Sequence, residues 1–221
     1  SELASRFSNN VLDATQGWHN LVTDEAELAG LPASAQAAAR QMAELKGKEG
    51  WLFTLDIPSY LPVMMYADSR ALRAELYEAF TIRASDQGPS AGKWDNSSIM
   101  SELLTLRREL AQLLGFANYA ELSLATKMAD KTEQVVSFLT DLAAKSLPQG
   151  KAELEEIRAF AAEQHGQSEL AAWDLAYYAE KLKQHKFSIS DEQLRPYFPA
   201  SRVVKGLFEV VKRVFGIKVR E

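Results

Sequence analysis

Apolar residues recur every three to four positions along most of the chain, which is the spacing of helices that bury one face. Glycine, proline and small polar residues interrupt this pattern where one helix should end and the next begin. The predicted helices cover residues 2–14, 33–46, 63–66, 69–85, 97–114, 118–127, 133–146, 151–164 and 168–186. Because so many helices are joined by short loops, we expect a mainly α fold with many packed helices.

Three short stretches have the character of strands instead. Residues 18–23 and 51–55 are short and apolar, and we expect them to pair as a small hairpin. Residues 217–220 alternate apolar and polar side chains, as a strand does. A lone strand leaves its backbone groups unpaired, so we expect this one to be truncated, with its sheet beyond residue 221. The whole chain, 1–221, is therefore expected to be a single partial region of a longer protein.

Two interruptions in the middle of the chain are predicted from glycine and proline. Residues 85–93 contain two glycines, a proline and small polar side chains, so we expect a mobile loop there. Pro148 and Gly150 predict a turn that separates the helices at 133–146 and 151–164.

The C-terminal third has its own start and stop signals. Ser190 and Gln193 have the spacing of a capping box, which predicts a short helix from Asp191 that ends at Pro196. A second helix should open at Pro199 and close at Gly216, the usual place of a left-handed cap. Its apolar stripe covers about half of its surface and includes Val203, Leu207, Val211 and Phe215.

Composition narrows the possible partners. Hydrophobic residues make up 47% and charged residues 25%, the balance of a folded globular protein, and a net charge of −5 gives no basis for nucleic-acid binding. With no cysteine, a disulfide framework and a thiolate metal site are excluded. No apolar run approaches the roughly 20 residues that span a bilayer, so we expect no membrane partner and a cytoplasmic location.

Candidate chemistry is sparse. The chain has three histidines, His19, His165 and His185, and none has a second histidine or a glutamate at the spacing of a metal site. We therefore expect no catalytic residue and no metal ligand in this chain.

The most interesting polar side chains are Tyr177, Tyr178, Arg195 and Tyr197. Tyrosines offer contact area and a hydroxyl, and arginine pairs with carboxylates, so these four could line a peptide-binding wall. The alternative is structural: Arg195 pairs with a nearby acid and holds the joint at Pro196. The structural interpretation is favoured, and the substrate role stays open.

A family resemblance extends over nearly the whole chain. It rests on the motifs ELAGLP at 27–32, GWLFTL at 50–55, WDNSSIM at 94–100, LRRELAQLLGFANYAELSLATKMA at 106–129 and LRPYFP at 194–199, with Trp173-Asp174 and Tyr177-Tyr178 before the last. With these residues the chain resembles the thimet oligopeptidase family of zinc peptidases. It departs from that family in one respect, because the family's His-Glu-x-x-His motif is absent.

The resemblance implies a helical, zincin-like scaffold whose two halves enclose a deep channel with one zinc ion at its floor. In such enzymes two histidines and a downstream glutamate hold the zinc, and the glutamate of the motif activates a water molecule. The substrates are short, unfolded peptides. None of these catalytic positions has a counterpart here, so the chain would supply the channel wall, with the approach to the catalytic half at about 168–221.

Two hypotheses follow. In the first, the chain is part of a zinc-dependent oligopeptidase, inactive alone, whose partners are peptides and the remaining catalytic half of its own chain. In the second, it is a self-contained helical module that binds peptides or proteins without catalysis. In the first hypothesis the chain should expose apolar surface where its missing half would dock, at the terminal strand and the helix at 203–215, and we expect self-association through that surface.

Overall fold

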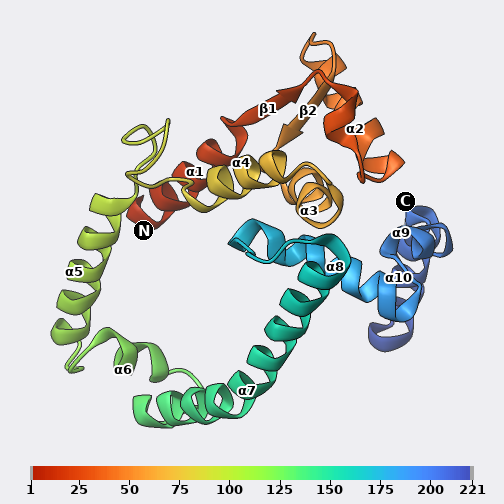
Figure 1. Cartoon of the computed structure of the whole chain (residues 1–221). Coiled ribbons are helices and arrows are strands. Elements are labelled where there is room, and N and C mark those ends of the chain that lie inside the picture. The colour runs from red at the N-terminus through yellow and green to blue at the C-terminus, as the bar shows by residue number, and fades with distance from the viewer. Residues whose placement is uncertain (1, 220–221) are drawn as a thin grey trace. The chain divides into compact units, whose positions relative to one another are not determined.

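The computed structural model describes residues 2–219, with the backbone alone described for Asp191. Helices dominate, which confirms the mainly α fold, and the chain divides into two units, Ser1–Tyr178 and Ala179–Glu221 (Figure 1). The first unit contains α1 (Glu2–Gln16), β1 (His19–Val22), the 3-10 helix η1 (Glu25–Leu28), α2 (Ala33–Leu45), β2 (Trp51–Thr54), α3 (Ile57–Tyr66), α4 (Arg70–Thr81), α5 (Ser97–Leu113), α6 (Tyr119–Leu124), α7 (Thr132–His165) and the start of α8 (Ala172–Phe187). The second holds the rest of α8, α9 (Asp191–Leu194), the 3-10 helix η2 (Arg195–Tyr197) and α10 (Ala200–Phe215).

The predicted hairpin is present. Strands β1 and β2 pair antiparallel, with His19 opposite Thr54 and Val22 opposite Trp51. Helix α2 packs on β2, and both figures of the whole chain show this helix beside the hairpin. Phe53 is almost fully buried, so the hairpin contributes directly to the main core of the first unit.

That core forms where the hairpin, α3 and α4 meet. Val63 and Met64 of α3 pack with Leu72 and Leu76 of α4, and all four are at most 3% exposed. The helix α3 is longer than the sequence predicts, because it includes Pro58 and Pro62. Pro58 lies in the first turn, where the missing N–H has no partner to lose.

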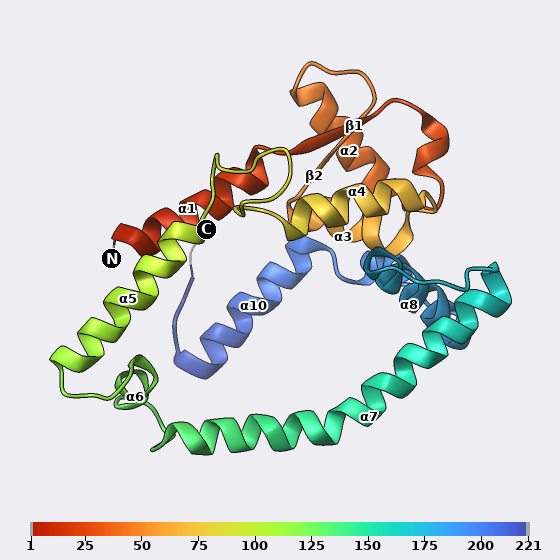
Figure 2. The same ribbon diagram turned by 60° about the vertical axis from the view of Figure 1, so that its left-hand side comes forward.

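The sequence-based turn at Pro148 is wrong. Helix α7 is continuous from Thr132 to His165 with Pro148 inside it, and Figure 2 shows that it bends along its length. An interior proline removes one backbone hydrogen bond and clashes with the preceding turn, which bends a helix without always ending it.

In the second unit the predicted signals are confirmed, except at the end. Helix α9 begins at Asp191, and the Ser190 N–H donates to Gln193 Oε1 at 3.2 Å. Helix α10 ends at Gly216, which is left-handed with φ of 70°. The predicted truncated strand is not formed by Ile217–Val219, and Arg220 lies outside the described range, so the expected pairing beyond residue 221 stays a prediction. A strand needs a partner ladder, and this segment has none among residues 2–219.

The loop at 85–93 contains no helix or strand, as predicted, and its mobility stays a prediction. Within the described part of the chain, none of the helices is both long enough and apolar enough to cross a bilayer.

Candidate functional site

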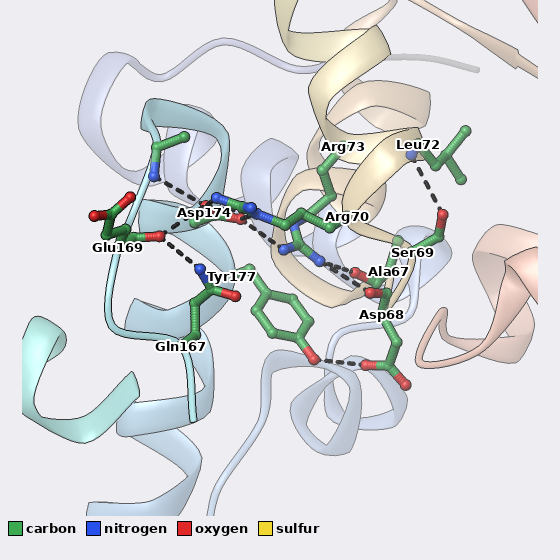
Figure 3. A network of polar contacts seen from close by, with 11 residues as sticks. Ala67, Asp68, Ser69, Arg70, Leu72, Arg73, Gln167, Glu169, Asp174 and Tyr177 are labelled. Carbon is green, nitrogen blue, oxygen red and sulfur yellow. Dashed lines mark hydrogen bonds and ion pairs between the residues drawn. The ribbon is translucent and has the colours of Figure 1, made fainter. Parts of the chain in front are cut away.

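The most elaborate polar site of the first unit lies where the first turns of α4 and α8 meet. Ser69 caps α4 by accepting a hydrogen bond from the Leu72 N–H at 3.3 Å, which places Arg70 and Arg73 one turn apart on the new helix. Residues i and i+3 of a helix share a side, so both guanidinium groups reach the same target. That target is Asp174, about a hundred positions later in the chain (Figure 3).

Asp174 is fully buried and accepts five hydrogen bonds. Arg70 donates to it through Nε, at 3.1 and 3.0 Å to the two carboxylate oxygens, and through Nη2 at 2.7 Å. Arg73 Nη2 donates to the Oδ1 atom at 2.8 Å, and the Ala171 N–H donates to Oδ2 at 2.9 Å. A carboxylate in this position needs such compensation, because burying an unpaired charge is very costly.

Arg73 is itself buried, at 2% exposure, and it extends the network to the end of α3. Its Nη1 donates to the Ala67 carbonyl at 2.6 Å and more weakly to the Asp68 carbonyl at 3.3 Å. The guanidinium lies 4.1 Å from the centre of the Tyr177 ring, a cation–π distance. The same tyrosine donates its hydroxyl to Asp68 Oδ1 at 2.7 Å.

Burial and hydrogen bonds shift the pKa of two groups in the site, Asp174 and Tyr177. Burial alone would raise the pKa of Asp174, but the hydrogen bonds from Arg70 and Arg73 outweigh it, and the pKa lies below its ordinary value. Burial, and then the hydrogen bond to Asp68, raise the pKa of Tyr177, so its hydroxyl stays protonated and donates. The hydrogen bonds from Arg70 and Arg73 to Asp174 fasten the start of α8 to the start of α4.

The sequence motifs include Asp174 and Tyr177 but neither Arg70 nor Arg73, so most of this network is not predicted from the sequence. One sequence signal points to Arg73. It lies between Leu72 and Leu76, on the apolar side of α4. An arginine on that side is buried and therefore needs a partner of opposite charge.

The four candidate peptide contacts fall in different units. Tyr177 and Tyr178 belong to the first unit, are both 7% exposed, and pack with Ala161 of α7. Arg195 and Tyr197 belong to the second unit, where Arg195 pairs with Glu192 at 3.0 Å and Tyr197 is 72% exposed. The ion pair agrees with the structural interpretation of Arg195, and contact of any of the four with a peptide stays a prediction.

The described residues do not fit a zinc ion. Among residues 2–219, no group of three histidine, aspartate, glutamate or cysteine side chains is close enough together to hold a metal. His19 lies 2.8 Å from the Lys48 ammonium through its Nε2 atom, and His165 contacts the rings of Phe160 and Tyr178.

The comparisons with known proteins agree with the resemblance. A family model described as Peptidase family M3 matches residues 63–221. The chain is 66% identical to oligopeptidase A of Escherichia coli and 65% identical to oligopeptidase A of Salmonella typhimurium, each over all of its 221 residues. It is 43% identical to a probable cytosolic oligopeptidase A of Arabidopsis thaliana over 99% of its length.

This chain belongs to peptidase family M3. The three relatives carry the name oligopeptidase A, and the chain spans about a third of their length, 32% in each case.

Proposed function

We propose that the chain is the non-catalytic, channel-forming part of a zinc-dependent oligopeptidase that hydrolyses short, unstructured peptides. The observation that carries this proposal is the identity of 65–66% to two bacterial oligopeptidases A along the entire chain. At that level of identity, over a third of each relative, the fold and role of the matching third are expected to be shared.

In a protein as long as the relatives, the zinc and its ligands would lie outside the third that these 221 residues match. Two features support this division. The sequence has no His-Glu-x-x-His motif, and residues 2–219 contain no cluster suited to a metal. On this proposal the 221-residue chain alone neither retains zinc nor breaks peptide bonds.

The proposal is tested by assaying the purified chain for zinc content after dialysis and for cleavage of an internally quenched peptide of about ten residues. The expected result is no stoichiometric zinc and no cleavage that a chelator suppresses. Chelator-sensitive cleavage by the pure chain would show that the catalytic centre lies within it, and would overturn the division of roles.

Direct contact with a peptide substrate is proposed mainly for residues of the second unit. Tyr197 is exposed, and Arg195 is more than half exposed despite its ion pair, so both remain accessible to a peptide. Tyr177 and Tyr178 of the first unit are buried, which favours a structural role for them over direct contact with a peptide. Calorimetry with unstructured peptides of about ten residues, on the chain and on an Arg195→Ala variant, measures any direct contact.

One observation favours the second function, a helical binding module. Six apolar side chains of α10 are at least 43% exposed: Val203, Val204, Leu207, Val210, Val214 and Phe215. Such a stripe is typical of a helix that packs against another surface. In an oligopeptidase it would meet the rest of the chain, whereas in the isolated chain we propose that it drives self-association.

We also propose a cytoplasmic location. The absence of cysteine suits a reducing compartment, and one relative is named as a probable cytosolic enzyme. Detection of the protein in the soluble cytoplasmic fraction of its own cells, rather than with membranes, is the expected result.

A further inference from the structure

A cavity of about 210 Å³ lies in the first unit between the end of α1, the second half of α4 and the loop that follows α4. It is separate from the network around Asp174, since neither Asp174 nor the two arginines bound to it line the cavity. Its volume is below the roughly 300–1,000 Å³ of pockets for drug-sized ligands, so it suits a very small molecule.

Apolar side chains form the inner wall. Ala14 and Leu55 are 6% and 1% exposed, and Trp18 and Ile82 complete this surface. An apolar group of a few carbon atoms would be shielded from water there, which is the main source of affinity for small ligands.

Arg83 gives the cavity a fixed positive charge. Its Nε donates to the Phe80 carbonyl at 2.8 Å, its Nη1 donates to Thr15 Oγ1 at 2.9 Å, and its guanidinium lies 3.6 Å from the centre of the Phe80 ring. Partial burial of the guanidinium lowers the pKa of Arg83. Among the described residues, no carboxylate forms an ion pair with Arg83.

An arginine held in this way is a prepared site for a carboxylate. Its neutral contacts orient the guanidinium without neutralising it. The group is therefore preorganised, and a carboxylate ligand would not have to order it on binding. Arg73 provides the contrast within the same unit, because its charge is matched by Asp174.

The cavity also carries negative charge. Glu75 and Glu78 line it from α4, three positions apart and therefore on one side of the helix, and both are exposed to solvent. A ligand with a carboxylate alone would be repelled by these two groups, whereas a ligand that also carries an ammonium group would be attracted by them.

We propose that this cavity binds a free α-amino acid with an apolar side chain, whose carboxylate pairs with Arg83 and whose ammonium group faces Glu75 and Glu78. The side chain of the amino acid packs against the apolar wall formed by Trp18 and Leu55. This binding requires no peptidase activity in the chain, so it can be tested whether or not the proposed function is correct.

The test is isothermal titration calorimetry of the 221-residue chain with L-leucine. Saturable binding of one leucine is expected, with affinity reduced at least about tenfold, or about 1.4 kcal/mol, for leucinamide and for 4-methylpentanoate. The first analogue lacks the carboxylate and the second lacks the ammonium group. Absence of saturable binding up to about 10 mM leucine, which corresponds to a binding free energy of about −3 kcal/mol, would overturn the proposal.

Two variants locate the binding. Arg83→Gln should abolish it, and Arg158→Gln, which alters an exposed arginine of α7 outside the cavity, should leave it unchanged. Arg83 also supports Thr15, so the first variant could lose its fold. Ala79→Leu therefore serves as a second test, because Ala79 lines the cavity and is not among the residues that Arg83 contacts, Phe80 and Thr15. Unchanged affinity in a folded Ala79→Leu variant would contradict the assignment.

Discussion

At the scale of single residues, the first unit depends on one carboxylate that serves two arginines. Asp174 is fully buried, and so is the Arg73 charge that it neutralises. Removing one partner from a buried ion pair leaves an unpaired charge, which costs far more than the pair itself contributes. The site should therefore be very sensitive to changes that conserve its shape and remove its charge.

Asp174→Asn is expected to lower the free energy of unfolding by about 3–5 kcal/mol, the usual effect of orphaning a buried charge. Asp141→Asn is the matched control: it breaks an exposed pair with Lys145, and should cost less than about 1 kcal/mol. Urea denaturation followed by circular dichroism measures both. Equal effects would mean that the Asp174 network does not stabilise the fold.

The same variant tests the pH dependence. The folded state lowers the pKa of Asp174, so the stability it contributes is present above its unfolded pKa, about 4, and is lost as pH falls through the folded value. Between those values the wild-type chain should lose stability more steeply than Asp174→Asn.

Gly30 is a second residue with an unusual role. Its φ of 82° is left-handed, and an added Cβ would lie 2.2 Å from the Tyr66 carbonyl and 2.6 Å from Asp68 Oδ1, the acceptor of the Tyr177 hydroxyl. Gly30→Ala should cost about 2–5 kcal/mol, from backbone strain and overpacking together.

Gly47→Ala separates the two causes. Gly47 also has a positive φ, 65°, but an added Cβ there meets nothing within 4 Å. This variant should cost only the strain, about 1 kcal/mol. Thermal unfolding of the two variants side by side measures the difference, and similar losses would contradict a close approach at Gly30.

At the scale of elements, α7 shows what local sequence signals leave open. Pro148 is a strong breaker, and its sequence neighbours predicted a turn, yet the helix runs from Thr132 to His165. Capping signals were more dependable where the side chain contacts the backbone directly, as at Ser69 and at the Ser190–Gln193 pair. The hairpin was predictable because its two apolar stretches are short and the only obvious partners for each other.

Replacing the interior proline should stabilise α7. Pro148→Ala restores a backbone hydrogen bond and should favour the helix by up to about 3 kcal/mol. Pro58→Ala, in the first turn of α3, should change stability by less than about 1 kcal/mol. Amide hydrogen exchange within α7 reports the effect, and faster exchange in Pro148→Ala would contradict it.

The apolar stripe of α10 leads to a prediction about association. If the isolated chain self-associates through this helix, Leu207→Glu should shift it toward the monomer, because a charge in an apolar contact is strongly unfavourable. Lys205→Glu changes the same helix away from the stripe and should leave association unchanged. Sedimentation velocity at several concentrations measures this, and a wild-type chain that is monomeric throughout would rule it out.

At the scale of the whole molecule, the sequence predicted the fold class and the family, and it could not predict the Asp174 network. Helical periodicity is a local property, so it can be recognised in a single sequence. The partnership of Arg70 and Arg73 with Asp174 spans about a hundred residues, and nothing in the intervening pattern encodes it. For the same reason the four candidate peptide contacts could be named by residue type, while their placement in two different units could not.

On the proposed function, this chain forms the non-catalytic third of a zinc oligopeptidase. This proposal is tested most directly by exchanging the matching third of Escherichia coli oligopeptidase A, to which the chain is 66% identical, for this chain. The account predicts that the folded hybrid cleaves a short fluorogenic peptide in a chelator-sensitive way, while the 221-residue chain alone does not. A well-folded hybrid without activity, or an active isolated chain, would contradict the account.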